Sequence, residues 1–275
     1  MKTAIVTDSN SGITQEQAAR WGVRVVPMPI IIDNEIYYEG VNLSPEQFYQ
    51  YLREGRNVST SQPAPEDLTG VWDSLLAEGW DEIVYIPMSS GLSSSCQTAL
   101  ILAGDYGGRV QVADNHQISV PQKNAVRDAA ALAQAGLEAR EIKARLEEAG
   151  GDSLIYIGVD TLEYLKRGGR ITPAVAAMGS VLNIKPLLAI RGEKLDTFAK
   201  VRGIRRCRTL LLESMRRSVD EYRQRGLDIR VDASGSFESQ EEAQAWQDMA
   251  AQAFPGEEIQ YDPLSLSIGS HTGPG

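Results

Sequence analysis

The sequence predicts a two-domain α/β protein, in which a Rossmann-like parallel-sheet domain is followed by a mixed α+β domain. Short apolar segments alternate with amphipathic helical segments through the first half of the chain, which is the pattern of strand–helix–strand units. The apolar segments are continuous, as in parallel strands that are buried on both faces. The glycine pair Gly150-Gly151 ends this alternation. We therefore expect an N-terminal α/β domain over residues 1–150 and a C-terminal α+β domain over residues 151–275.

Strands of the first domain are predicted from apolar runs, and helices from capping signals. The expected strands are Ala4–Val6, Val23–Ile32, Glu82–Pro87 and Val110–Ala113. A hydroxyl residue followed three positions later by glutamine predicts helices from Thr14 to Arg20 and from Ser44 to Leu52. A proline predicts another helix from Pro65. Further helices are expected from the serine-rich segment through Leu102, near residues 120–135 and near residues 138–149.

The second domain has a less regular pattern. A hairpin is predicted around Gly192-Glu193, because two strand-like runs flank this glycine turn. A long amphipathic helix is expected over Ile204–Arg223. The remaining expected elements are strands at Ser153–Val159, Leu227–Ala233, Glu258–Tyr261 and Leu264–Ile268, and helices at Leu162–Lys166, Pro173–Leu182 and Ser239–Ala253.

The distribution of charge restricts the range of partners. The net charge of −10 argues against nucleic acid binding over the whole surface. Residues 166–217, however, contain 13 Lys and Arg against Glu193, Asp196 and Glu213, a net charge of +10. This basic segment is either a solvated helix and hairpin or a docking face for an acidic partner or a phosphate. The charge pattern alone leaves both open.

Several common sites are absent from the sequence. The sequence contains only two cysteines, Cys96 and Cys207, so we expect no disulfide framework. We also expect the protein to occupy a reducing compartment. With only two histidines and no paired cysteines, we expect neither a metal site nor a cofactor. The longest apolar run, Val25–Ile32, is too short to span a bilayer. We therefore expect a cytoplasmic protein without a transmembrane segment.

Hydroxyl side chains follow the carboxyl ends of the predicted strands, which is where ligands usually bind to parallel sheets. Ser89, Ser90, Ser93, Ser94 and Ser95 precede a predicted helix, and Thr60 and Ser61 precede Gln62-Pro63. Helix capping and loop solvation explain single serines, but five in seven positions exceed that need. Helix N-termini and hydroxyl donors suit a carboxylate or a phosphate. The pattern favours an anion site at the carboxyl ends of the strands.

Two further side chains could bind the same kind of anion. Arg170 follows Gly168-Gly169 and could form paired hydrogen bonds to an oxyanion. Its ordinary interpretation is a surface arginine beyond a helix C-cap. His271 follows apolar residues that predict a docked C-terminal segment, from which the imidazole could donate to a carboxylate. His116 lies in a polar loop and is interpreted as a surface residue.

Seven segments, in this order, resemble the DegV family over essentially the whole chain. They are Ile5–Ser9, Thr60–Pro63, Ser89–Ser93, Tyr164–Ile171, Leu182–Pro186, Lys200–Gly203 and His271–Gly275. Each segment is short, but seven of them in the family's order form a specific match. The chain departs from the family pattern at Ser94-Ser95, where Gly-Thr is usual. It also departs at Asn115, where serine is common, and at Ser119–Gln122, where glycines are usual.

The resemblance implies a two-domain protein of the EDD fold that holds a long-chain fatty acid between its domains. It implies that Thr60, Ser61, Ser93 and His271 contact the carboxylate, together with Ser94 of the same loop. Arg170 would aid docking or a phosphoryl step. Many bacterial relatives are lipid-carrying subunits of a fatty acid kinase, in which a separate ATP-dependent protein phosphorylates the bound carboxylate. We therefore expect a non-enzymatic lipid-binding subunit, with a kinase partner and transient membrane-surface contact.

Hydrophobic burial is sufficient for such a ligand. Each buried methylene contributes about 0.8 kcal/mol, so a sixteen-carbon chain gains on the order of 10 kcal/mol before association costs. A carboxylate that is buried with the chain needs hydrogen bonds to offset its desolvation. Candidate lining segments are Val26–Ile32, Leu162, Ala174–Met178 and Leu187–Ile190, each of which could equally be plain core.

Two other functions remain open. An acyl hydrolase would use Ser93 as nucleophile and His271 as base, although no carboxylate is evident to orient the histidine and no nucleophile elbow is present. The expected fold is also similar to the substrate-binding domain of dihydroxyacetone kinases. A small polar ligand of that kind is the third hypothesis.

Overall fold

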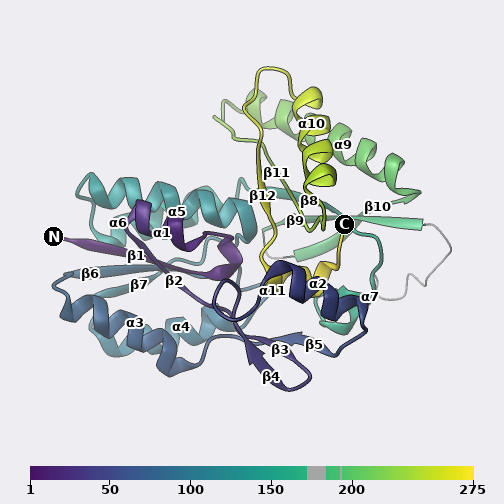
Figure 1. The fold of residues 1–275 in the computed structure, drawn as a ribbon. Coiled ribbons are helices and arrows are strands. Elements are labelled where there is room, and N and C mark those ends of the chain that lie inside the picture. Colours follow the sequence, from purple (N-terminus) through teal and green to yellow (C-terminus); the bar gives the residue numbers. More distant parts are fainter. Residues whose placement is uncertain (172–183, 193) are drawn as a thin grey trace. The chain divides into compact units, whose positions relative to one another are not determined.

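Figure 1 shows the fold in a computed structural model, which describes residues 1–171, 184–192 and 194–275. The chain forms two compact units. The first unit contains Met1–Ser153, Arg191–Lys194 and Ser265–Ile268. The second contains Leu154–Ile190, Leu195–Leu264 and Gly269–Gly275. The predicted helix Pro173–Leu182 and the predicted lining segment Ala174–Met178 lie outside the described residues.

A four-stranded parallel sheet forms the centre of the first unit, as predicted. Its strands are β1 (Thr3–Asp8), β2 (Val23–Val26), β6 (Glu82–Ile86) and β7 (Val110–Val112), in the order β2-β1-β6-β7. The register pairs Thr7 with Ile86 at the ends of β1 and β6. The carboxyl ends of these two strands therefore lie side by side.

Helices cover both faces of this sheet (Figure 1). One face carries α1 (Gln15–Trp21), α5 (Ser119–Gln134) and α6 (Ala139–Gly150), and the other carries α3 (Pro65–Ala77) and α4 (Ser95–Ala103). Successive strand residues point to opposite faces. Ile5 and Val84 accordingly pack in one cluster, and Val6 and Tyr85 in the other. Because both faces are buried, the strands appear in the sequence as continuous apolar runs.

Local capping agrees with the sequence prediction. Thr14 and Gln17 form a reciprocal capping box at α1. Ser44 and Gln47 form another at α2 (Pro45–Arg53). Two short 3₁₀ helices, η1 (Ser9–Ser11) and η2 (Gly104–Tyr106), complete the helical elements of the first unit's larger segment.

The predicted single strand Val23–Ile32 is wrong. The chain leaves the parallel sheet after Val26 and forms β3 (Ile30–Ile32) in a separate antiparallel sheet with β4 (Glu35–Tyr37) and β5 (Val58–Thr60). Proline donates no hydrogen bond to a strand ladder, and Pro27 and Pro29 lie at the break. The change of sheet has a consequence for the site, because it pairs Ile30 with Thr60.

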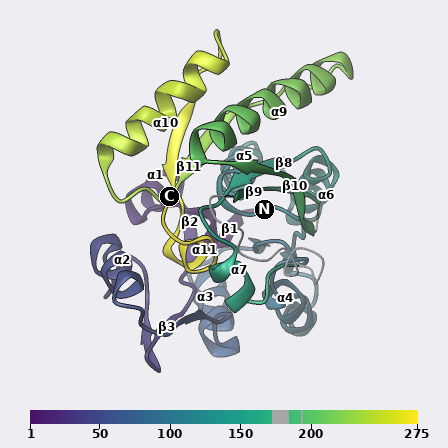
Figure 2. The same ribbon diagram turned by 90° about the vertical axis from the view of Figure 1, so that its right-hand side faces the viewer.

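The second unit contains a three-stranded sheet in the order β10-β9-β8. The predicted hairpin is present as β9 (Ile184–Arg191) and β10 (Lys194–Arg202), and β8 is Leu154–Gly158. The long helix α9 (Ile204–Gln224) packs on β8. Figure 2 also shows α10 (Gln240–Ala253) beside β11 (Asp232–Gly235), which pairs in parallel with β12 (Gln260–Pro263).

Two strand predictions near the C-terminus are corrected. The predicted strand Leu227–Ala233 is observed only from Asp232. The predicted strand Leu264–Ile268 is wrong, because α11 (Leu266–Thr272) begins there instead. The backbone N–H of Leu266 donates to the side chain of Glu39 at 2.9 Å, which satisfies one of the amides that a helix start leaves unpaired. The helix carries His271 near its C-terminal end.

Candidate functional site

Asp8 organises the sheet edge at the end of β1. One carboxylate oxygen accepts from the N–H of Met88 at 2.7 Å, and the other accepts from the N–H of Asn10 at 2.9 Å. Gln122 of α5 adds a weaker donation to Asp8 at 3.3 Å. Asp8 is fully buried, and burial raises the pKa of its carboxyl group despite these donors. Because Met88 immediately precedes the serine-rich segment, Asp8 fixes where that segment starts.

The serines of residues 89–95 are not equivalent. Ser89 is buried, its N–H donates to the carbonyl oxygen of Gln117 at 2.7 Å, and its hydroxyl oxygen accepts from the N–H of Gly91 at 3.2 Å. These bonds shape the loop itself. Ser95 is also buried, but its hydroxyl finds no hydrogen-bond partner among the described residues.

Ser93 is the serine best arranged to donate to an anion. Its hydroxyl oxygen accepts from the N–H of Ser95 at 3.1 Å, and its side chain is half-buried. A hydroxyl that accepts one bond still has its proton to donate. Ser94 occupies the N-cap of α4 but makes no side-chain capping bond. Its hydroxyl donates instead to Gln62 at 3.3 Å, so helix capping does not explain this serine.

The Thr60-Ser61 segment lies close to the serine loop within the first unit. Thr60 ends β5, and the N–H of Ser61 donates to the carbonyl oxygen of Pro29 at 3.1 Å. The next residue, Gln62, accepts from Ser94 and from Thr98 of α4, the latter at 3.1 Å. The structure therefore brings together two of the predicted hydroxyl segments.

His116 contacts the serine loop more closely than its interpretation as a surface residue suggested. Its Nδ1 atom lies 3.5 Å from the hydroxyl oxygen of Ser90 and 3.3 Å from a carboxylate oxygen of Asp114. A Ser-His-Asp triad needs the serine and the carboxylate on opposite ring nitrogens. Here both approach the same nitrogen, so the arrangement is not a triad. Only the nearby Asp114 signalled this contact in the sequence.

In the second unit, Gly168 and Gly169 have different roles. A Cβ atom on Gly168 would lie 2.1 Å from Nδ1 of His271, so only glycine fits against this ring. Gly169 has a positive φ of 68°, a backbone conformation that residues with a Cβ atom rarely adopt. The turn ends with Arg170, whose N–H donates to the carbonyl oxygen of Leu165 at 3.1 Å. The Arg170 side chain is exposed and donates to the carbonyl oxygen of Gly168.

His271 is held as a neutral imidazole. Burial lowers its pKa to about 4, and the positive charge of Arg170 adds to this effect. A neutral imidazole has one N–H donor and one acceptor nitrogen. The predicted docking of the C-terminal segment agrees with two contacts: the Ser236 hydroxyl donates to the carbonyl oxygen of Gly273 at 2.7 Å, and Gly273 lies against the ring of Tyr164.

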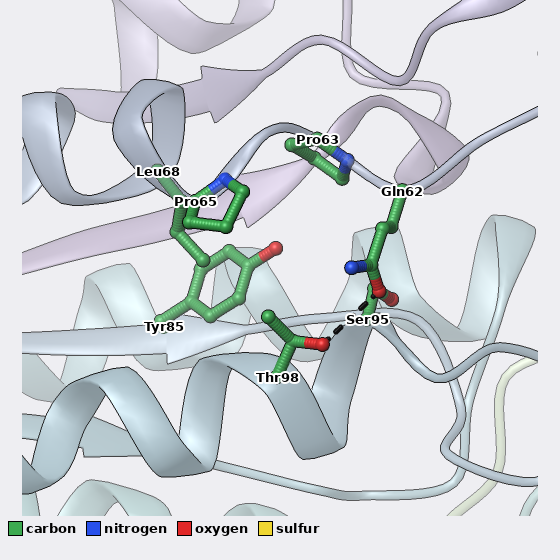
Figure 3. Close-up of a pocket in the computed structure, with 7 residues that line it drawn as sticks. All are labelled: Gln62, Pro63, Pro65, Leu68, Tyr85, Ser95 and Thr98. Atoms are coloured by element: carbon green, nitrogen blue, oxygen red, sulfur yellow. Dashed lines mark hydrogen bonds between the residues drawn. The ribbon is translucent and has the colours of Figure 1, made fainter.

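A small pocket lies behind Gln62 in the first unit (Figure 3). Its empty space of about 210 Å³ includes open solvent, so the pocket encloses no cavity of ligand size. This pocket alone is too small for a long acyl chain. Its lining residues are Gln62, Pro63, Pro65, Leu68, Tyr85, Ser95 and Thr98.

Neither metal ligation nor cysteine chemistry is evident in the described ranges. They contain no group of three or more His, Cys, Asp or Glu side chains that could hold a metal ion. Cys96 is buried, and burial raises the pKa of its thiol to about 12, which disfavours the reactive thiolate. None of the helices in the described part of the chain is long and apolar enough to cross a membrane.

Comparison with known proteins identifies the family. The family model described as "Uncharacterised protein, DegV family" matches residues 2–275. The chain belongs to the DegV family. A DegV domain-containing protein from Deinococcus radiodurans is 37% identical over 223 residues, which cover 81% of this chain and 79% of the relative. The resemblance predicted from the seven sequence segments is thereby confirmed.

Solved DegV structures share this fold. A fatty-acid-binding DegV family protein from Thermus thermophilus has 32% identity and a TM-score of 0.86, covering 100% of this chain and 97% of the other. A fatty-acid-binding DegV family protein from Streptococcus agalactiae has 26% identity and a TM-score of 0.88, covering 100% and 96%. The predicted α/β fold class is confirmed over 97% and 96% of these two relatives.

Proposed function

We propose that this DegV family protein binds a long-chain fatty acid through hydrogen bonds to its carboxylate. The main support for the proposal is the hydrogen bonding of the Ser93 hydroxyl. Its hydroxyl oxygen already accepts from a backbone N–H, so its proton is left for an anionic ligand. The full-length similarity to the fatty-acid-binding protein from Thermus thermophilus supports a fatty acid as that ligand.

The remaining site residues have distinct roles in this proposal. Thr60 and Ser61 supply further hydroxyl donors, and His271 supplies an N–H donor without a charge that would have to be desolvated. Arg170, with its exposed guanidinium, attracts the carboxylate or aids a phosphoryl step. Ser94 contributes to binding too. Because its hydroxyl donates to Gln62, this contribution would come from holding the loop.

The first experiment measures fatty acid binding directly. Lipid-stripped protein is titrated with palmitate, and we expect saturable one-to-one binding. Ser93→Ala should weaken affinity about 10- to 100-fold, because a hydrogen bond to a charged group contributes about 1.5–3 kcal/mol. Ser74→Ala is the matched control, since this exposed serine bonds Glu78 on α3. Absence of saturable binding by the wild-type protein would end the proposal.

The same variant separates fatty acid binding from acyl ester hydrolysis. A hydrolase with Ser93 as nucleophile would lose its esterase turnover in Ser93→Ala. We expect instead that any background turnover is unchanged. Dihydroxyacetone serves as a competitor in the palmitate titration. Displacement of palmitate by this small polar molecule would favour the third hypothesis.

The proposal extends to a kinase partner. We propose that the protein acts as the non-enzymatic subunit that presents the bound carboxylate to an ATP-dependent kinase in the cytoplasm. The basic segment supports this role, because Arg202 and Arg205 are exposed at the junction of β10 and α9. Taking up and returning a buried acyl chain also requires brief contact with a membrane surface.

Charge reversal tests the docking part separately. The double substitution Arg202→Glu with Arg205→Glu should leave palmitate affinity unchanged and reduce ATP-dependent acyl-phosphate formation by a partner kinase at least tenfold. Arg223→Glu with Arg225→Glu, at the far end of α9, is the control of equal charge change. Equal loss of lipid binding and of kinase coupling would contradict a specific docking role.

A further inference from the structure

The two hydroxyl segments of the first unit belong to different sheets. Thr60 ends a strand of the antiparallel sheet, whereas the serine loop follows β6 of the parallel sheet. Sheet hydrogen bonding therefore does not fix the distance between Thr60-Ser61 and Ser93. A carboxylate that uses hydroxyls from both segments needs that distance to be constant.

Gln62 provides a connection between the segments. Its amide oxygen accepts from the hydroxyl of Ser94 at 3.3 Å and from the hydroxyl of Thr98 at 3.1 Å. Figure 3 shows the second of these bonds. An amide oxygen has two lone pairs, so two hydroxyl donors saturate it. Gln62 directly follows Ser61, and Ser94 directly follows Ser93, so the bonds join the immediate neighbours of the proposed ligand-binding hydroxyls.

The Ser94 bond uses the only proton of that hydroxyl. In this chain the Ser94 hydroxyl donates its proton to Gln62. While that bond is made, the same proton cannot bind a carboxylate.

The surroundings of Gln62 strengthen the half-buried Thr98 bond more than the Ser94 bond, because Ser94 is exposed to water. Gln62 is half-buried beside the apolar side chains of Pro63, Pro65 and Leu68, which line the pocket of Figure 3. Hydrogen bonds are stronger where water is excluded. The buried hydroxyls of Tyr85 and Ser95 also face this pocket and have no partner among the described residues. Water that entered after the Gln62 bonds opened would hydrate these two hydroxyls, so they favour opening, whereas the apolar side chains oppose it.

We propose that Gln62 is a positioning residue, which with Ser94 and Thr98 forms a clamp that sets the spacing of the carboxylate-binding hydroxyls. This inference rests on the proposed fatty acid function for its effect on affinity. The clamp itself is a property of the lipid-free protein and can be measured without any ligand.

The test compares variants that remove either side of the clamp. Gln62→Met removes the acceptor and Thr98→Val removes one donor, each with little change of volume. We expect Gln62→Met to weaken palmitate affinity about tenfold, because both hydrogen bonds of the clamp are lost. The double variant should bind about as weakly as Gln62→Met alone, because both substitutions break the same interaction. Thr98→Ser should restore wild-type affinity.

A matched control and a second readout complete the design. Thr69→Val removes a threonine hydroxyl that bonds Pro65 on the neighbouring helix α3, and it should leave affinity unchanged. Hydrogen exchange of the lipid-free protein should become faster at residues 60–62 and 89–95 in Gln62→Met and remain unchanged in Thr69→Val. The inference is overturned if exchange in these segments is unchanged, or if the affinity losses of the two single variants add. Failure of the wild-type protein to bind palmitate would instead remove the proposed function, while the exchange result would still decide whether the clamp exists.

Discussion

The serine loop of the first unit and the His271 region of the second unit are held in different ways. Hydrogen bonds shape the serine loop: the Met88 N–H donates to Asp8 at its start, and the Ser95 N–H donates to the Ser93 hydroxyl at its end. Close contacts with glycines shape the His271 region, where Gly168 leaves no room for a Cβ atom. The first arrangement depends on donors and acceptors. The second depends on space, because a Cβ atom at Gly168 or Gly273 would overlap a neighbouring ring.

The largest effect should come from Gly168→Ala, which breaks the close-contact arrangement. The new Cβ atom would lie 2.1 Å from Nδ1 of His271, so the ring must move. We expect stability to fall by about 1–3 kcal/mol, as for other overpacked sites, and palmitate affinity to fall at least tenfold. Thermal unfolding and palmitate titration measure the two effects.

Gly70→Ala is the control for this substitution. Gly70 lies inside α3, and no neighbouring atom lies within 4 Å of the position that a Cβ atom would take. Alanine should therefore stabilise the protein by about 0.5–1 kcal/mol through helix propensity alone. The comparison between the two arrangements fails if Gly168→Ala behaves like Gly70→Ala, because His271 would then not depend on the close contact.

Changes of pH should have an intermediate effect on stability. Each unit contains a buried titratable group with a shifted pKa, and the two groups change stability in opposite directions as pH rises. Burial raises the pKa of Glu39 from 4.5 to about 7, and the Leu266 N–H only partly offsets this. Between these values the folded protein binds more protons than the unfolded chain, so the Glu39 contribution to stability falls as pH rises. Burial lowers the pKa of His271 from 6.5 to about 4. The unfolded chain then binds more protons, and the His271 contribution rises with pH over that window.

Single substitutions should separate these opposing contributions. The melting temperature of Glu39→Gln, relative to wild type, should increase as pH rises from 4.5 to 7. That of His271→Gln, relative to wild type, should decrease as pH rises from 4 to 6.5. Thermal unfolding across this pH range checks both slopes. Variant profiles that run parallel to the wild-type profile would show that neither group has a shifted pKa.

Sequence patterns predicted the parts of the molecule that depend on local chemistry. The continuous apolar runs predicted the parallel sheet, and the hydroxyl–glutamine spacing predicted the helix starts at Thr14 and Ser44. The strand break after Val26 was missed, although Pro27 and Pro29 signalled it. The links from Gln62 to Thr98 and from Gly168 to His271 join distant parts of the chain. Such contacts follow from the packed fold, which no local spacing encodes.

The smallest expected effect on stability comes from a buried hydroxyl of the first unit that makes no hydrogen bond to the described residues. The Tyr85 side chain is fully buried, and its hydroxyl has no partner among the described residues. An unpaired buried hydroxyl costs free energy that phenylalanine avoids. We expect Tyr85→Phe to stabilise the protein by about 1 kcal/mol, which raises the melting temperature by about 2–4 °C for a protein of this size.

Tyr106→Phe, in contrast, should lower the stability of the protein. Both rings pack edge-on against Trp72, with centroid separations of 5.8 Å for Tyr85 and 5.3 Å for Tyr106. The Tyr106 hydroxyl, however, donates to Asp73 at 2.8 Å. The two substitutions remove the same atom from similar aromatic contacts and differ in that hydrogen bond and in burial, since Tyr85 is fully buried and Tyr106 is half-buried. A loss of stability in both variants would mean that the Tyr85 hydroxyl has a hydrogen-bond partner in solution.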